Sequence, residues 1–137
     1  MNRPDAYLFF DGNCAEAMRF YERVLGGKIE TLMTAGESPE AANLPPESRN
    51  RILHSRLAFD GGALMASDWM APHPYEKKQG FSLSITAKTV DEGKRLFDEL
   101  SAGGHATMPF GKSFWSEGFG MLVDRFGTPW MVSVEHS

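Results

Sequence analysis

The sequence predicts an α+β fold made of two copies of one β-α-β-β-β module. Each half opens with a short apolar strand that leads into an amphipathic helix, and each helix stops at a pair of glycines. The helix residues Phe20 and Gly26 recur as Phe97 and Gly103 with unchanged spacing. Strands separated by turn residues follow each helix. Matching helices, stops and hairpins together indicate a duplicated module.

The first copy begins with a strand over residues 6–10 and continues with a helix in GNCAEAMRFYERVLGG. We expect Asn13 to cap this helix and Glu16 to complete a capping box. The strand KIETLM follows, and the strands RILHSRLAF and GALMASD are separated by DGG, a strong hairpin signal. The apolar stripe of the helix comprises Cys14, Ala17, Met18, Tyr21, Val24 and Leu25.

The second copy begins with the strand FSLSIT over residues 81–86, and a helix in TVDEGKRLFDELSAGG follows. Thr89 and Glu92 predict a second capping box. SFWSEGFGMLVD and TPWMVSV are predicted as strands on either side of the turn RFG. We therefore expect one domain, with module one at residues 5–68, a linker at 69–79 and module two at 80–136.

The segment at residues 35–51, AGESPEAANLPPESRNR, shows no strand pattern and is long for a loop within a compact domain. Such a length is typical of a lid or of a dimer contact. The alternative is a solvated excursion with no role of its own. The sequence leaves these interpretations open.

Composition narrows the function classes. The 137 residues carry a net charge of −4 without any run of basic residues, so we expect no nucleic-acid partner. No apolar run is long enough to span a bilayer, and the N-terminal residues lack the apolar stretch of a signal peptide. The single cysteine, Cys14, excludes an internal disulfide framework. We therefore expect a cytoplasmic protein without a membrane partner.

Several phrases of the sequence together resemble one family. They are YLFFDGNCAEAMRFYERVLGG, ALMASDWM, GFSLSI, DEGKRLFDELSAGG and FWSEGFGMLVDRFGTPWMVSV. The chain resembles, over essentially its whole length, the PhnB-like branch of the vicinal oxygen chelate superfamily, which includes glyoxalases, bleomycin-resistance proteins and extradiol dioxygenases. The resemblance implies a glyoxalase/bleomycin-resistance fold, in which curved mixed sheets form a cup with helices outside, and usually a homodimer. Some members carry a 3-demethylubiquinone methyltransferase label, but no G-x-G-x-x-G turn follows a strand here.

The resemblance also implies a divalent metal held by His, Gln or Glu side chains from four strands. The strand at residues 6–10 offers no such ligand, and Met65 stands where a glutamate is expected. Ser82 occupies the histidine position of the family, and Met131 occupies the position of its last glutamate. A thioether site for Cu(I) is conceivable, but packing is the simpler role for these methionines. We therefore expect a cup without metal and without cofactor.

Strand alternation predicts which other side chains face the cup. Ser82, Ser84 and Thr86 share one face of their strand, and the apolar face of Phe81, Leu83 and Ile85 is expected to pack on a helix. His54 and Arg56 share a face that is directed toward the cup or the solvent. The candidate ligand-binding residues are His54, Arg56, Met65, Ser67, Ser82, Ser84, Trp115 and Met131.

Each candidate has a plainer alternative. His54 is a candidate acid or base because imidazole titrates near neutral pH, but an edge histidine without a role is the simpler interpretation. Arg56 suits an anion, and a surface ion pair is the simpler interpretation. Trp115 offers a flat wall or is core. For three further residues the structural role is preferred: Asp68 as a turn or cap residue, Trp130 as core, and Cys14 as a buried hydrophobe.

These observations favour a metal-independent protein that binds a small molecule. The alternative is a metal-free lyase, isomerase or transferase that acts on a small metabolite with His54 as acid or base. A third hypothesis is a structural partner that kept the fold and lost the pocket.

Overall fold

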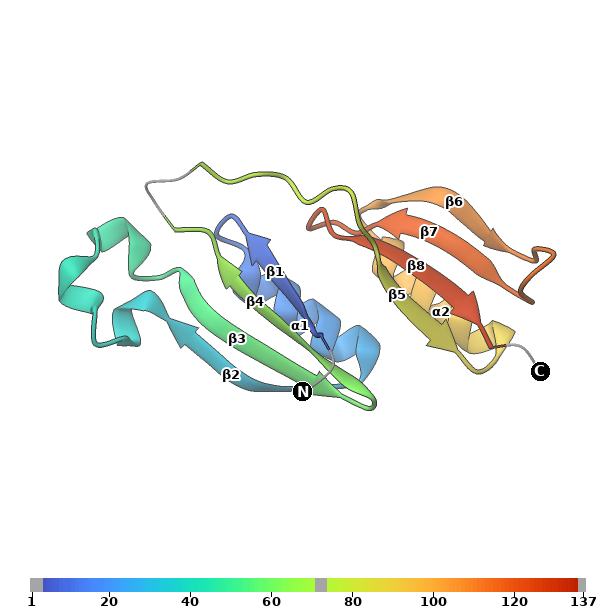
Figure 1. The fold of residues 1–137 in the computed structure, drawn as a ribbon, viewed down its shortest axis with the longest axis horizontal. Helices are drawn as coiled ribbons and strands as arrows, with labels where there is room; N and C mark the ends of the chain where they lie inside the picture. Colours follow the sequence, from blue (N-terminus) through green and yellow to red (C-terminus); the bar gives the residue numbers. More distant parts are fainter. Residues whose placement is uncertain (1–3, 71–73, 136–137) are drawn as a thin grey trace. The chain divides into compact units, whose positions relative to one another are not determined.

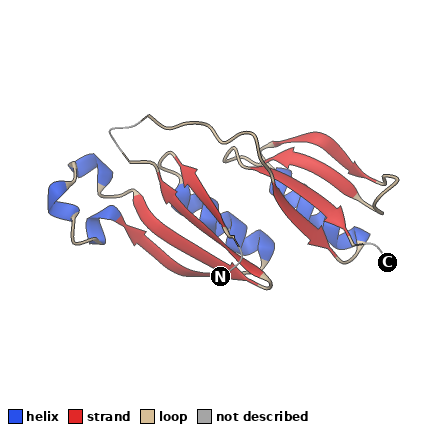
Figure 2. Cartoon of the chain, in the orientation of Figure 1, coloured by secondary structure: helices blue, strands red, loops and turns tan. Residues whose placement is uncertain are grey.

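The computed structural model describes residues 4–70 and 74–135. The chain divides into two compact units, Met1–Glu76 and Lys77–Ser137. Each unit packs one α-helix against one face of a four-stranded sheet (Figures 1 and 2).

The first unit contains β1 (Ala6–Phe10), α1 (Cys14–Leu25), β2 (Lys28–Thr34), β3 (Ile52–Phe59) and β4 (Gly62–Asp68). Its strand order is β1-β4-β3-β2, with β1 parallel to β4 and the other neighbours antiparallel. The core between α1 and the sheet includes Leu8, Phe10, Met18, Tyr21 and Leu57, all of them buried.

The second unit repeats this arrangement with β5 (Leu83–Ala87), α2 (Val90–Ser101), β6 (His105–Gly111), β7 (Phe119–Val123) and β8 (Pro129–Val134). Its order is β5-β8-β7-β6, with β5 parallel to β8. The fold-class prediction of two β-α-β-β-β modules is confirmed. Trp130 is buried in the core, as predicted, together with Leu96, Phe97, Leu100 and Val132.

Two strand predictions in the second unit are wrong at their starts. The strand expected at residues 81–86 begins at Leu83, and Phe81 is 44% exposed instead of packing on the helix. The strand expected from residue 113 begins at Phe119, because the buried Ser116 bends the chain before it. The Ser116 hydroxyl contacts the carbonyl oxygens of Gly118 at 2.7 Å and Val134 at 3.1 Å. Such local bonds compete with ladder pairing.

The segment at residues 35–51 folds into three 3₁₀ turns: Ala35–Glu37, Ala41–Asn43 and Pro46–Ser48. The Ala35 amide donates to the Arg51 carbonyl at 2.8 Å, which ties the segment to the start of β3. The Thr34 hydroxyl, and then the Thr34 amide, donate to Glu37 and lower the pKa of that carboxyl. Because folding lowers the pKa of Glu37, the stability that this carboxylate contributes is present at pH values above its ordinary pKa. That stability is lost as the pH falls through the lowered pKa of the folded protein. A lid or dimer role stays a prediction.

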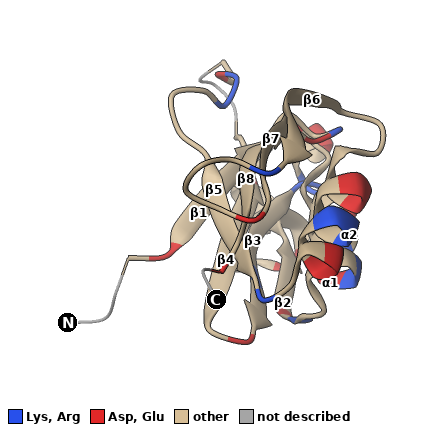
Figure 3. Cartoon of the chain, turned by 90° about the vertical axis from the view of Figure 1, so that its right-hand side faces the viewer, with Lys and Arg blue, Asp and Glu red and all other residues tan. Residues whose placement is uncertain are grey.

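Basic and acidic residues alternate along α2 (Figure 3). Lys94 pairs with Asp98 at 2.8 Å, and Arg95 pairs with Glu99, each one helical turn apart. Among the described residues, no helix has the length and apolar character needed to cross a membrane.

Candidate ligand-binding faces

The first sheet has an open face, opposite α1, that we call the first open face. Along β1, Leu8 and Phe10 are buried toward the helix, while Tyr7 and Phe9 are 38% and 41% exposed. The ladder places Tyr7 opposite Met65 and Phe9 opposite Ser67, and Arg56 also pairs with Met65. Side chains of three neighbouring strands therefore share this face.

Four rings follow one another on the first open face, and we call them the aromatic row: Trp69, Phe9, Tyr7 and His54. The ring of Phe9 meets Trp69 edge-on at 5.1 Å and Tyr7 at the same centroid distance. Tyr7 stacks on the His54 imidazole at 5.9 Å, with an angle of 27° between the planes. The Tyr7 hydroxyl also lies 3.2 Å from His54 Nδ1, within hydrogen-bond distance.

The Tyr7–His54 pair gives this face a polar end. If Nδ1 accepts the phenol proton, Nε2 carries the imidazole hydrogen and is a donor. The aromatic row then offers flat apolar walls at one end and a hydrogen-bonding imidazole at the other. Such a surface can hold a planar molecule and can exchange a proton with it.

Sequence reasoning placed His54 here but missed Tyr7, Phe9 and Trp69. As metal donors the residues of β1 are unsuitable, so the metal argument gives no reason to single them out. The alternation of Tyr7 and Phe9 with Leu8 and Phe10 was the signal that could have assigned these two rings to the open face.

The remaining candidates of the first unit differ in accessibility. Met65 is half-buried on the first open face, whereas Ser67, opposite Phe9, is only 6% exposed. Arg56 forms an ion pair with Glu30 on β2. Of the two roles considered for Arg56, anion binding and a surface ion pair, this is the simpler one. A ligand that uses the guanidinium must share it with that carboxylate.

The second sheet has a corresponding second open face. Ser84 pairs with Met131, Met131 pairs with Met121, and Thr86 pairs with Ser133. Ser84 and Thr86 are exposed, so the hydroxyl-bearing face of β5 is directed away from α2, as alternation predicted. Ser82 precedes the strand. Trp115 lies in the loop before β7, half exposed and edge-on to Phe119 at 5.3 Å.

Asp68 has a structural role at the end of β4. The residue is 3% exposed, and its carboxylate accepts hydrogen bonds from the backbone amides of Gly12 at 2.8 Å, Cys14 at 3.0 Å and Ile52 at 2.8 Å. Two of these amides lie at the start of α1. The prediction that the Asn13 side chain caps this helix is therefore wrong, because that side chain makes no capping bond and Asp68 takes its place. Thr89 does cap α2, accepting from the Glu92 amide at 3.1 Å.

Cys14 is fully buried at the first turn of α1, with its sulfur 3.6 Å from the Ser55 hydroxyl. This is the environment of a buried hydrophobe, the role that the apolar stripe favours, because a reactive thiolate needs access to solvent or to a partner.

The donor set does not fit a hard divalent metal. The paired positions on the two open faces are Tyr7 with Met65 and Ser84 with Met131. Phenol, thioether and hydroxyl groups are poor substitutes for the imidazole and carboxylate ligands that such metals need. Within residues 4–70 and 74–135, no three His, Cys, Asp or Glu side chains gather as a metal site would require.

We expect dialysed protein to contain less than about 0.1 Zn, Ni, Fe or Mn per chain, because no suitable set of ligands meets among the residues that the structure describes. Equilibrium dialysis against each metal, followed by elemental analysis, measures this ratio. One tightly bound ion per chain would contradict the expectation.

The fold is shared with a glyoxylase/bleomycin resistance protein/dioxygenase domain from Frankia sp. EAN1pec. That structure is 13% identical, has a TM-score of 0.68, and matches over 99% of this chain and 98% of its own. At this identity the likeness shows the fold alone. Two mixed sheets, each backed by one helix and open on the other face, thus define a protein of the glyoxalase/bleomycin-resistance fold.

The family follows from nearer relatives. A family model described as 3-demethylubiquinone-9 3-methyltransferase matches residues 4–133. Protein YjdN of Escherichia coli K12 is 38% identical over 136 residues, 93% of this chain and 92% of YjdN. The crystal structure of PA1353 from Pseudomonas aeruginosa is 42% identical, with a TM-score of 0.92 over 100% of both chains. A Bacillus cereus PhnB protein, named as a putative 3-demethylubiquinone-9 3-methyltransferase, is 25% identical with a TM-score of 0.83, over 98% of this chain and 100% of its own. The chain belongs to this PhnB-like family.

Proposed function

We propose that this protein binds a small, partly planar molecule without a metal ion. The observation that carries the proposal is the aromatic row, in which Tyr7 and Phe9 are exposed on a sheet face and which ends at the Tyr7–His54 hydrogen bond. Exposed rings beside one convergent polar pair are typical of sites that stack a planar ligand and orient it by a hydrogen bond. Met65 beside Tyr7 adds an adaptable apolar contact.

A thermal-shift screen of aromatic and heteroaromatic metabolites in EDTA tests this proposal, because a ligand that binds only the folded state raises Tm. We expect at least one stabilising compound. The Kd of this compound is expected to rise roughly tenfold in His54→Gln and in Tyr7→Phe, because each variant loses about one hydrogen bond. His105→Gln, an exposed histidine on β6, is the matched control and should leave Kd unchanged. Absence of hits, or hits indifferent to both variants, would refute the proposal.

A second candidate function is metal-free proton transfer on the bound molecule. The 3.2 Å contact between the Tyr7 hydroxyl and His54 Nδ1 favours it, since a tyrosine can orient an imidazole and stabilise one tautomer. Turnover that persists in chelator and disappears in His54→Ala would select this function over simple binding. If an experimental structure showed the first open face filled by side chains of the protein itself, the hypothesis of a structural partner without a ligand would be favoured instead.

We also propose a cytoplasmic homodimer. Large apolar side chains on the surface support the dimer: Phe114 is 96% exposed, and Phe9 and Trp115 are exposed as well. We expect light scattering at micromolar concentration to give twice the chain mass of 15.2 kDa. A species of 15.2 kDa would contradict the dimer.

A further inference from the structure

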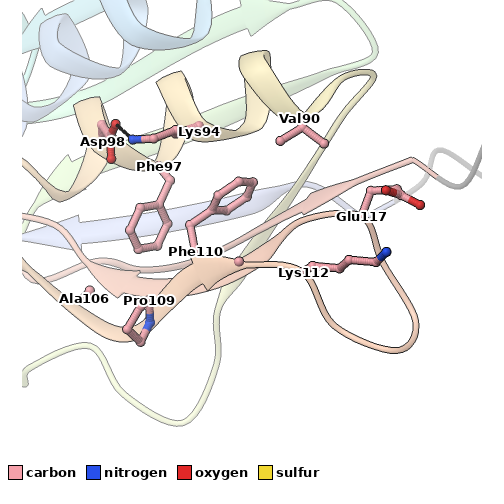
Figure 4. A pocket seen from close by; sticks show the side chains of 10 residues that line it. Val90, Lys94, Phe97, Asp98, Ala106, Pro109, Phe110, Lys112 and Glu117 are labelled. Carbon is pink, nitrogen blue, oxygen red and sulfur yellow. Dashed lines mark hydrogen bonds and ion pairs between the residues drawn. The ribbon is translucent and has the colours of Figure 1, made fainter.

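A pocket of about 350 Å³ lies in the second unit, on the helix side of its sheet (Figure 4). It opens between α2 and β6, the edge strand. The pairing of β6 with β7 is irregular at two places, between Ala106 and Met108 and between Met108 and Gly111. Bulges bend an edge strand away from regular pairing, which leaves room beside the helix. The volume falls at the lower end of the range for small-molecule sites.

Two phenyl rings form the pocket floor. Phe97 of α2 and Phe110 of β6 lie 5.7 Å apart and tilted by 37°. Glycines leave space for both: a Cβ on Gly118 would lie 2.5 Å from Phe110 Cζ, and one on Gly120 would lie 2.7 Å from Phe97 Cε2. A Cβ on Gly93 would also be tight against Phe110, at 3.1 Å. The close packing fixes the rings as a rigid apolar surface.

The pocket rim carries charges of both signs. Figure 4 shows Lys112 and Glu117 near one end and the Lys94–Asp98 ion pair on the helix. Lys94 and Asp98 satisfy each other at 2.8 Å. For the part of the chain that is described, neither Lys112 nor Glu117 has an ion-pair partner within 4.0 Å. One cation and one anion at the same end are thus available to a ligand.

We propose that this pocket binds a zwitterion with an apolar side chain, that is, a free aromatic or branched α-amino acid. The side chain packs on Phe97 and Phe110, the carboxylate pairs with Lys112, and the ammonium pairs with Glu117. A monoanion would bring its charge near the Glu117 carboxylate, and a monocation would do the same at Lys112. A zwitterion satisfies both charges and keeps the apolar floor covered.

The test uses L-phenylalanine, 3-phenylpropionate and phenethylamine as probes, since the last two each lack one charge. Binding to the full chain is followed by NMR titration to about 10 mM, where even a millimolar Kd is measurable. We expect L-phenylalanine to bind and to lose roughly tenfold in affinity in K112M and in E117Q. Phenethylamine should lose affinity in E117Q and gain affinity in K112M, where the repulsion from the lysine is removed. 3-Phenylpropionate should show the opposite pattern. K88M, an exposed lysine outside the pocket, is the matched control.

The proposal would be overturned if the three probes did not respond differently to K112M and E117Q. It would also be overturned if L-phenylalanine did not bind, or if it bound all variants equally. Lys112 and Glu117 are exposed, so both variants should fold, and unchanged Tm values confirm that they do. Resonances of Phe97 and Phe110 should shift, whereas those of Tyr7 and His54 should not. This readout separates the pocket from the first open face, so failure here leaves the proposed function intact.

Discussion

Replacing Asp68 with alanine is expected to lower the free energy of unfolding by about 3–5 kcal/mol. The change removes the acceptor for three backbone amides, those of Gly12, Cys14 and Ile52. Because Asp68 is only 3% exposed, water cannot readily replace its carboxylate. Asp68→Asn should cost less, since the amide oxygen still accepts. Urea unfolding followed by circular dichroism measures both losses.

Asp11→Ala is the matched control for the Asp68 variants. Within residues 4–70 and 74–135, the Asp11 carboxylate accepts a hydrogen bond only from Arg51, and its side chain is 59% exposed. Its removal should therefore cost at most about 1 kcal/mol. Amide hydrogen exchange localises the effect: in Asp68→Ala the three amides should lose protection. Equal destabilisation by Asp11→Ala and Asp68→Ala would disprove the capping role of Asp68.

Replacing Asp124 with asparagine is expected to cost about 2–4 kcal/mol. One oxygen of the buried carboxylate accepts from the amides of Phe126 at 2.9 Å and Thr128 at 3.0 Å. The other accepts from the Trp130 indole at 2.8 Å. An asparagine has one acceptor oxygen, so its amide group must face a donor at one of these two positions. Urea unfolding followed by Trp fluorescence measures the loss.

A double-mutant cycle with Trp130→Phe tests the cause. Phenylalanine removes the indole donor, so Asp124→Asn should cost about 1–2 kcal/mol less in that background than in the native chain. Strict additivity of the two losses would show that the indole contact does not account for the sensitivity of Asp124.

Local signals in the sequence were sufficient for much of the fold. The Thr89 cap is predictable because donor and acceptor lie three residues apart. The cap of α1 is not predictable in this way, since Asp68 lies 54 residues beyond Cys14, whose amide donates a hydrogen bond to it. The late start of β7 has a similar cause, because Ser116 contacts the Val134 carbonyl 18 residues away. Tertiary contacts of this kind override local preference.

The candidate site was also predictable only in part. Strand alternation assigned His54 to an open face, but it cannot say which strands are neighbours. The contact of His54 with Tyr7 joins residues 47 positions apart and depends on the β1-β4-β3 strand order. The pocket beside α2 had no sequence signal, because it arises from irregular pairing of β6.

The central claim is that the first open face holds a small planar molecule without metal. The most direct test is an NMR titration of the best screening compound into EDTA-dialysed protein, observing methionine methyls and histidine rings. We predict saturable shifts of Met65 and His54, with the fully buried Met18 under the sheet unchanged. Binding that leaves Met65 and His54 unshifted, or that appears only when a divalent metal is restored, would contradict the claim.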